Sequence, residues 1–456
     1  MEFSTLIFLL FFFPSFLFSY FIFKKRKTRN LILLIFSLFF YAWGEPIYIL
    51  LMMLSIIMNY YFALLIDKTK YKKQFLIISI ICNILLLVIF KYTDFLISIF
   101  NFIFNSNVSL TNIALPIGIS FYTFQILSYV IDVYRKKVKV QKNIIYLGCY
   151  ICAFPQLIAG PIVTYDTVED ELDNRKESVT LFAEGIRRFI VGLSKKVLIA
   201  NAMGFVCDSI FNLNTSYWTF PLVWLGVITY TLQIFFDFSA YSDMAIGMGK
   251  MLGFNYLENF NYPYISKSIT EFWRRWHISL STWFRDYVYI PLGGNRVNKK
   301  RFCLNILIVW MLTGLWHGAS LNYLIWGLYY GLILLIEKLL LGKYLEKLPN
   351  ALRHIYTIFI FLLGWTIFRL ENIDHLLVAF KALFGFNGFG NLNLLIDIQV
   401  FQVQYIFYFI LGIILCMPIK ININKKIKDL LFIILFIYTI TVMVTGSYNP
   451  FIYFRF

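Results

Sequence analysis

Long apolar stretches recur along the whole 456-residue chain, and they limit its fold more than any other feature. Sixty per cent of the residues are hydrophobic and 14% are charged, whereas about 25% of the residues of a soluble domain are charged. Lipid offers no partners for backbone N–H and C=O groups, so such stretches must cross as helices or as closed barrels. Barrel strands alternate apolar and polar residues, and these stretches do not. The sequence therefore predicts an all-α polytopic membrane protein and excludes a soluble enzyme, a disordered chain and a disulfide scaffold.

The basic residues predict how the chain is oriented. Lys and Arg outnumber Asp and Glu by 41 to 24, and cytoplasmic loops of membrane proteins are rich in Lys and Arg. A basic cluster follows the first apolar segment instead of preceding it, so this segment is expected to be an uncleaved helix and no signal peptide. Placing each basic cluster in the cytosol predicts about twelve crossings in one integral-membrane domain, residues 1–456, with both termini extracytoplasmic. The crossings are expected within residues 3–23, 31–66 (two), 74–134 (two), 180–200, 219–241, 302–318, 321–341, 354–370, 401–418 and 430–446. The first pair is interrupted at Gly44-Glu45-Pro46 and the second pair by the neutral loop 105–112.

Two regions do not fit simple crossings. Residues 143–178 are interrupted by Pro155 and by Gly160-Pro161 and then become acidic, which favours a re-entrant region on the cytosolic side. Residues 250–300 are dense in Trp, Arg, Tyr and Gly, too polar to cross lipid alone. We expect them to form a re-entrant or in-plane region on the same side.

The second of these regions carries the first candidate site, TEFWRRWHISLSTWFRD at 270–286. If it forms one helix, one side of that helix holds five residues that suit a polar tunnel, and Arg275 and Trp276 point elsewhere. Arg binds phosphate in a fork geometry, and aromatic rings stack on flat groups. The alternative is an interfacial aromatic belt with Arg side chains reaching to the lipid headgroups. The five residues are Trp273, Arg274, His277, Ser281 and Arg285.

The second candidate site is LTGLWHGAS at 312–320. Gly314 and Gly318 form a GxxxG pair, which lets another backbone pack closely. His317 lies between them, and burial favours the neutral imidazole that a general base requires. The alternative is helix packing with an incidental histidine. The two other histidines, His354 and His375, have no polar neighbours in the sequence and are expected to be dispensable.

Other polar residues suggest structural roles. Asp237 and Asp243 lie in an otherwise apolar helix, and the Arg residues at 274–285 are their expected partners. Asp237 is also a candidate residue for binding the substrate or acyl donor. Cys149 and Cys152 form a lone CxxC without a second pair nearby, which indicates buried thiols and no zinc. The chain has no phosphate-binding GxxxxGK[ST] loop and no GxSxG elbow. We therefore expect neither a metal nor a cofactor.

Together, WRRWHISLSTWFRDYVYIPLGGN and LTGLWHGAS resemble the membrane-bound O-acyltransferases, most of all their bacterial branch of alginate O-acetyltransferase membrane subunits. Five further segments resemble the same branch, and the likeness spans nearly the whole chain. These segments are SLFFYAWGEP, LPIGISFYTFQ, FPQLIAGPI, FFDFSAYSDMAIG and the terminal FIYFRF.

The resemblance implies a multi-helix bundle around a central tunnel in the bacterial cytoplasmic membrane. Acyl-CoA would enter from the cytosol and donate its acyl group, most simply acetyl. The acceptor would be a hydroxyl of an extracytoplasmic polysaccharide or of a secreted or membrane-anchored partner acetyltransferase. By the same resemblance His317 is the catalytic histidine and His277 the second histidine of the tunnel.

Taken with the residue types, this predicts donor phosphates near Arg274, Arg275 or Arg285. Trp276 and Trp316 would shape the pore, and Thr313 or Asn322 would steady charge on the thioester oxygen. Two alternatives from other classes stay open at this point. A transporter or flippase for an acyl donor or glycan would also need a lined tunnel but would leave the thioester intact. A scaffold of an envelope assembly would need neither histidine.

Overall fold

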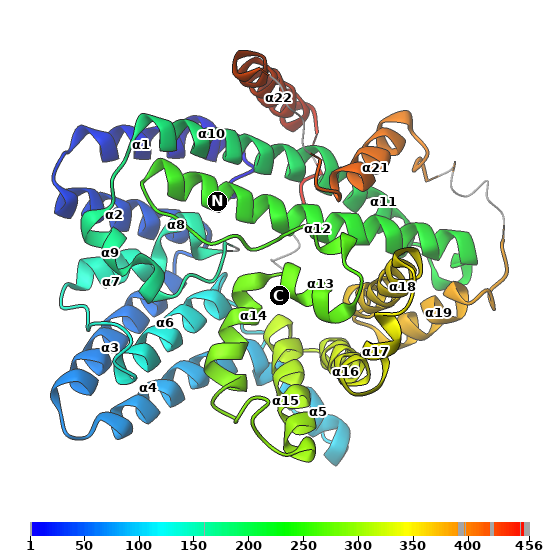
Figure 1. Ribbon diagram of the computed structural model, residues 1–456, viewed down its shortest axis with the longest axis horizontal. Helices are drawn as coiled ribbons and strands as arrows, with labels where there is room; N and C mark the ends of the chain where they lie inside the picture. The colour runs from blue at the N-terminus through cyan, green and yellow to red at the C-terminus, as the bar shows by residue number, and fades with distance from the viewer. Residues whose placement is uncertain are drawn as a thin grey trace. The chain divides into compact units, whose positions relative to one another are not determined.

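The computed structural model describes residues 2–158, 160–390, 396, 398–419, 424–446 and 448–450. Within these ranges every regular element is a helix (Figure 1). The prediction of an all-α membrane protein is therefore confirmed. The terminal FIYFRF motif, residues 451–456, lies outside the described residues.

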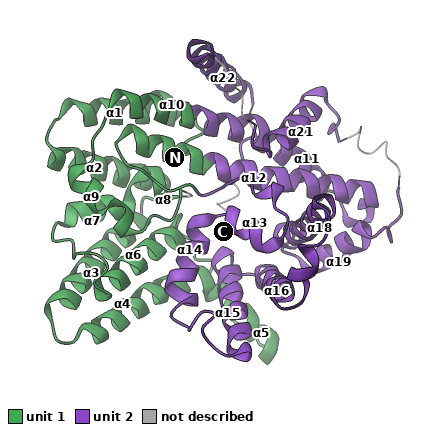
Figure 2. Ribbon diagram, viewed as in Figure 1, with its two compact units in different colours: residues 1–189, 241–258 green, residues 190–240, 259–456 purple. Residues whose placement is uncertain are grey.

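The chain divides into two compact units, Met1–Phe189 with Tyr241–Glu258 and Ile190–Ala240 with Asn259–Phe456 (Figure 2). Two helices, α10 (Val179–Ser194) and α12 (Phe220–Met251), contribute residues to both units. In the labels that follow, η marks a short 3₁₀- or π-helix.

The other helices of the first unit, which we call unit 1, are η1 (Phe8–Phe12), α1 (Phe13–Ile22), α2 (Arg26–Gly44), α3 (Tyr48–Lys68), α4 (Lys72–Leu87), η2 (Val88–Tyr92), α5 (Thr93–Phe104), α6 (Ile119–Tyr134), α7 (Ile144–Cys152), α8 (Phe154–Leu157) and α9 (Tyr165–Asn174). Those of the second, unit 2, are η3 (Lys195–Ala200), α11 (Asn201–Phe211), η4 (Thr215–Tyr217), η5 (Pro263–Ile265), α13 (Ile269–Arg275), α14 (Ile278–Phe284), η6 (Arg285–Tyr289), α15 (Lys299–His317), α16 (Leu321–Ile336), η7 (Glu337–Leu341), α17 (Gly342–Leu345), α18 (Asn350–Arg369), α19 (Ile373–Leu383), α21 (Val403–Leu415) and α22 (Lys425–Thr445).

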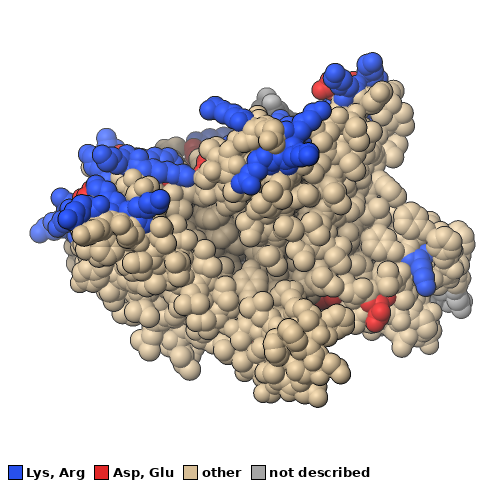
Figure 3. All heavy atoms as spheres, turned by 90° about the horizontal axis from the view of Figure 1, so that it is seen from below, with Lys and Arg blue, Asp and Glu red and all other residues tan. Residues whose placement is uncertain are grey.

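Seven helices in the described part of the chain are long and apolar enough to cross a membrane. Each of the twelve predicted crossing segments contains a helix, but the number of crossings stays a prediction. Figure 3 shows a surface on which most residues are neither acidic nor basic and Lys and Arg gather in separate patches. The chain is a multi-pass membrane protein. The seven helices are Tyr48–Lys68, Lys72–Phe104, Val179–Phe211, Phe220–Met251, Leu321–Leu345, Asn350–Arg369 and Lys425–Thr445.

Breaks in the sequence pattern coincide with helix ends. The helix α2 ends at Gly44, at the predicted Gly-Glu-Pro interruption. The helix α5 ends at Phe104, and Asn105 follows in the left-handed conformation with φ 48°, where the neutral loop begins. Residues 143–178 form the short helices α7, α8 and α9 instead of a long span.

A partly buried ionic cluster ties three segments of unit 1 together. Glu177 accepts hydrogen bonds from Tyr20 Oη at 2.8 Å and Arg26 Nη2 at 2.9 Å, and it pairs with Arg29 at 2.9 Å. Arg175, 3% exposed, donates to Tyr20 Oη and to Asn30 Oδ1. The basic flank of the first apolar segment is thus partly used for packing within unit 1.

Candidate active site

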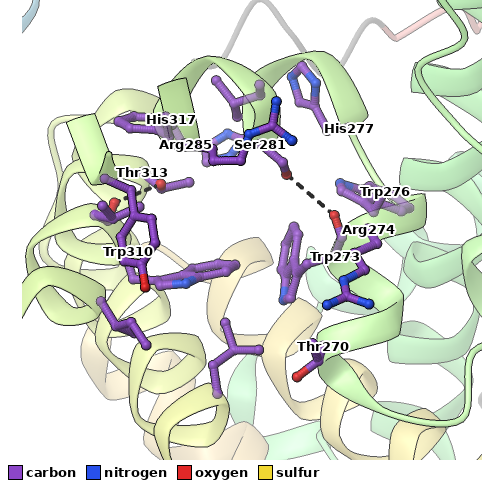
Figure 4. A pocket seen from close by; sticks show the side chains of 16 residues that line it. Thr270, Trp273, Arg274, Trp276, His277, Ser281, Arg285, Trp310, Thr313 and His317 are labelled. Carbon is purple, nitrogen blue, oxygen red and sulfur yellow. Dashed lines mark hydrogen bonds between the residues drawn. The ribbon is translucent and has the colours of Figure 1, made fainter. Parts of the chain in front are cut away.

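A pocket of about 260 Å³ lies in unit 2, between the α13–α14 segment and α15 (Figure 4). Trp273 of α13 and Trp310 of α15 both line it, and their rings meet edge to face with centroids 4.8 Å apart. Eight of the residues predicted to form the site line the same pocket. These are Trp273, Arg274, Trp276, His277, Ser281, Arg285, Thr313 and His317.

The segment that carries most of them is two helices and not one, which corrects the prediction. The helix α13 ends at Arg275, Trp276 is extended, and His277 has φ 44° and ψ 56° before α14 begins at Ile278. A left-handed conformation is uncommon for a residue other than glycine. The break turns the Trp276 side chain to the pocket, although a continuous helix would point it elsewhere.

His277 is 1% exposed and has polar contacts on one side of its ring. Its Nδ1 lies 3.2 Å from Asn259 Oδ1, and its Nε2 has no hydrogen-bond partner among the described residues. The ring of Phe238 meets it edge to face at 4.5 Å. Burial lowers the pKa of His277, which lies between α13 and α14, well below its usual range, and His317 lowers it further. Both effects favour the neutral imidazole over the charged form.

His317 is the last residue of α15 and is 7% exposed. Gly318, which follows, is extended and ends the helix. The rings of Trp316, Trp326 and Phe368 surround the imidazole, with centroids 5.0–5.1 Å away. These aromatic side chains surround the histidine with apolar groups next to the pocket.

A carboxylate fixes the start of α13. Glu337, buried in η7, accepts the backbone N–H of Ile269 at 2.7 Å and that of Thr270 at 2.8 Å. It also accepts the Thr270 hydroxyl at 2.6 Å. A carboxylate satisfies the unpaired donors of a first helical turn. Thr270 and Trp273, both on the pocket wall, are thereby held in place.

The segment from α13 to η6 contributes two arginines and a serine hydroxyl to the pocket wall. Arg274 is exposed and makes no hydrogen bond or ion pair with any residue that the structure describes. Arg285 pairs with Asp286 at 2.7 Å. Ser281 Oγ donates to the carbonyl oxygen of Trp273 across the α13–α14 break at 3.4 Å, as the dashed line in Figure 4 shows.

Four predicted site residues are absent from this pocket wall. Arg275 pairs with Glu271 at 2.9 Å, and Asn322 donates to the carbonyl oxygens of Ile367 and Phe368. The Trp316 ring is close to both histidines, with its centroid 5.9 Å from that of His277 and 5.0 Å from that of His317. The fourth residue is Asp237.

Asp237 does not pair with the Arg residues at 274–285, which corrects the prediction. It is buried and pairs at 2.8 Å with Lys196, which lies in η3 of unit 2. Asp243 lies in unit 1 and pairs with Arg188 at 2.6 Å. Both carboxylates are therefore matched by cations on neighbouring helices, as buried charges in a membrane require.

The residues of the site that the sequence did not predict include two on the pocket wall and one that contacts a histidine. Thr270 and Trp310 line the pocket, and Asn259 contacts His277. Trp310 lies on α15, seven residues before His317, and this helical spacing was available as a signal. No sequence pattern connects Asn259 with a histidine eighteen residues later, because the contact depends on the break in the helix.

A metal centre is not built into the described residues. No group of three or more His, Cys, Asp or Glu side chains in that part of the chain is close enough to hold an ion.

Residues 139–368 match the model of the membrane-bound O-acyltransferase family. The chain is 44% identical over 394 residues to the "Probable alginate O-acetylase AlgI" of Pseudomonas aeruginosa, covering 85% of this chain and 75% of that protein. It is 35% identical over 423 residues to the peptidoglycan O-acetyltransferase of Helicobacter pylori, covering 85% and 80%. It is also 33% identical to the teichoic acid D-alanyltransferase of Bacillus subtilis, over 48% of this chain and 58% of that protein.

The match extends over half of the chain, and the relatives named O-acetylase or O-acetyltransferase cover most of it. Residues 139–368, which match the family model, include His277, His317 and all the residues that line the pocket. Transfer chemistry, and not transport or scaffolding, is thus the shared property. The chain belongs to the membrane-bound O-acyltransferase family and is an O-acyltransferase.

Proposed function

We propose that this protein transfers an acetyl group from cytosolic acetyl-CoA to a hydroxyl of an extracytoplasmic polysaccharide or of a partner acetyltransferase. One observation carries the proposal: His277 and His317 line one pocket together with Arg274, Arg285 and an aromatic wall. The names of the relatives favour a glycan or cell-wall acceptor, and we place the protein in the bacterial cytoplasmic membrane. The expected topology has both termini extracytoplasmic.

In the proposed reaction His317 acts as the general base. Its neutral imidazole takes the proton of the acceptor hydroxyl while the oxygen attacks the thioester carbon. The C–S bond then breaks, the imidazolium returns the proton to sulfur, and free CoA thiol leaves toward the cytosol. A positioned general base typically contributes about 10²–10⁴-fold to the rate. The surrounding Trp326 and Phe368 rings keep water from competing with the acceptor.

The pocket size supports a short acyl group. Its volume of about 260 Å³ is below the range of roughly 300–1,000 Å³ that holds drug-sized ligands. A whole acyl-CoA does not fit inside it, so the nucleotide must remain near the exposed Arg274 and Arg285. Guanidinium groups bind phosphate through paired hydrogen bonds. Thr313, on the pocket wall, is better located than Asn322 to contact a thioester.

The experiment uses the full chain in proteoliposomes with labelled acetyl-CoA and, as acceptor probes, alginate oligosaccharides or peptidoglycan fragments. Wild type should form O-acetyl ester and release CoA thiol. The His317→Ala variant should be at least about 10²-fold slower, whereas the control His375→Ala should match wild type because His375 is an exposed residue of α19. Acetyl-CoA that reaches the far side intact would indicate a carrier. Undiminished transfer by the folded His317→Ala variant would overturn the proposed role.

A further inference from the structure

Asn259 is fully buried and precedes the α13–α14 segment by ten residues. Its side-chain oxygen is close to three groups of the two residues His277 and Ser279, at the break and in the first turn of α14. It lies 3.1 Å from the backbone nitrogen of Ser279, 2.9 Å from Ser279 Oγ and 3.2 Å from His277 Nδ1. The Asn259 carbonyl oxygen also accepts the N–H of Ile278 at 2.9 Å. Asn259, which belongs to neither α13 nor α14, therefore stabilises the break between these two helices.

The contact with Ser279 fixes which way the Asn259 amide is turned. A backbone N–H can only donate, so the side-chain atom that faces it must be the oxygen. Turning the amide over would aim its NH₂ group at the Ser279 N–H, donor against donor. The orientation of this amide therefore follows from the backbone and not from the histidine.

The orientation of the amide in turn decides the tautomer of His277. An amide oxygen only accepts, so Nδ1 of His277 must carry the hydrogen and donate it. In a neutral ring the lone pair is then on Nε2. That atom is buried, has no hydrogen-bond partner among the described residues, and belongs to a side chain that lines the pocket.

We infer that Asn259 is a positioning residue that locks His277 in the Nδ1–H tautomer, so that Nε2 offers a lone pair to a hydrogen-bond donor of the substrate. The inference rests on the proposed function, because it gives this lone pair a use in acyl transfer. The donor would be an amide N–H of the acyl donor or the hydroxyl of the acceptor. Both are neutral donors, as a buried site with aromatic walls favours.

The left-handed backbone of His277 fits this role. At φ 44° the residue adopts a conformation that costs energy for most side chains, and such conformations persist only where the surroundings impose them. The bonds from Ile278, Ser279 and His277 to Asn259 are those surroundings. The ring and the backbone are therefore held by the same residue, through its side-chain oxygen and its backbone carbonyl oxygen.

The tautomer can be measured without any activity. The chain has four histidines, so protein labelled with ¹⁵N at His Nδ1 or at His Nε2 gives few signals, and the His277→Asn variant assigns the one of interest. At pH 8 the wild type should show a protonated Nδ1 and an unprotonated Nε2 for His277. The Asn259→Asp variant should keep this pattern because a carboxylate also accepts. The Ser279→Ala variant, as matched control, should keep it too. A protonated Nε2 in the wild type would overturn the inference.

Measurements of acetyl transfer distinguish a positioning role of Asn259 from a role in packing alone. Asn259→Ala should lower the rate of acetyl transfer by about tenfold or more, with 10⁴-fold as the upper bound for a wrong tautomer, and Asn259→Asp should restore it. If Nε2 meets the acyl donor, KM for acetyl-CoA rises in Asn259→Ala. If it meets the acceptor, KM for the glycan probe rises. If Asn259→Ala fails to fold, the spectra of the wild type and of Asn259→Asp still decide the tautomer. A correct tautomer without any transfer would refute the proposed function, whereas a wrong tautomer in an active enzyme would refute this inference.

Discussion

Gly314 of α15 and Gly327 of α16 pack backbone against backbone. A Cβ on either glycine would lie 3.3 Å from the Cα of the other. It would also meet a main-chain oxygen, that of Tyr323 at 2.2 Å or that of Trp310 at 2.3 Å. The predicted GxxxG contact is thus real for Gly314, and Gly318 packs on the Tyr323 ring instead. This close approach sets the position of Trp310 and His317 at the pocket.

Replacing Gly327 by alanine should therefore damage the site from a distance. The added methyl group meets backbone, which cannot rotate away, so α15 and α16 must separate. Overpacking of this kind costs roughly 1–3 kcal/mol. Thermal unfolding of purified protein should shift to lower temperature, and acetyl transfer should fall with it. Gly412→Ala is the control, since its Cβ would contact only side-chain atoms at 3.3–3.6 Å. Equal stability of the two variants would contradict the prediction.

Arg274 and Arg275 are adjacent in the sequence but have different surroundings. Their variants can therefore distinguish an effect on donor binding from an effect on stability. Arg274 is on the pocket wall and has no partner among the described residues, whereas Arg275 pairs with Glu271. Arg274→Ala should raise KM for acetyl-CoA, about tenfold if one phosphate contact worth 1.4 kcal/mol is lost. Arg275→Ala should leave KM nearly unchanged. The measurement is initial rate against acetyl-CoA concentration, and the reverse ranking would show that the donor approaches elsewhere.

The helices were predictable from the sequence because a segment that crosses lipid must be apolar and must satisfy its own backbone hydrogen bonds. Each segment expected to cross contains a helix, and Gly44 and Asn105 stand where α2 and α5 end. Hydropathy and turn residues determine these features locally. The number of crossings needs the position of each helix relative to a bilayer and stays a prediction.

The site was predictable only in part, because its geometry depends on a break. Helical spacing put Trp273, Arg274, His277, Ser281 and Arg285 together, and all line one pocket although the helix is interrupted. The partners of the buried carboxylates could not be deduced, since Lys196 and Arg188 are distant in sequence. His354 also has a polar neighbour, the Ser266 carbonyl oxygen at 3.2 Å from its Nδ1. Its predicted dispensability stays a prediction.

The ionic cluster of unit 1 should make the stability of the protein depend on pH in the acidic range. Burial alone raises the pKa of Glu177, but hydrogen bonds from Arg26 and Tyr20 outweigh it and lower the pKa from 4.5 to about 2. A depressed folded-state pKa gives stability that is present above pH 4.5 and lost as the pH falls toward 2. The melting temperature should drop over this window more steeply in wild type than in Glu177→Gln. Parallel curves would show that the cluster is not responsible.

The left-handed backbone of His277 allows its ring to be removed with little effect on the fold. Asparagine tolerates this conformation better than most residues, so His277→Asn should keep the α13–α14 break and leave the melting temperature close to that of wild type. His277→Ala adds backbone strain of roughly 1 kcal/mol to the lost ring and should be less stable. Both variants lose Nε2, so both should transfer acetyl groups more slowly. If Nε2 contacts substrate, the two rates per folded molecule should be equally low. A His277→Asn variant that is stable and as fast as wild type would show that the ring matters only for packing.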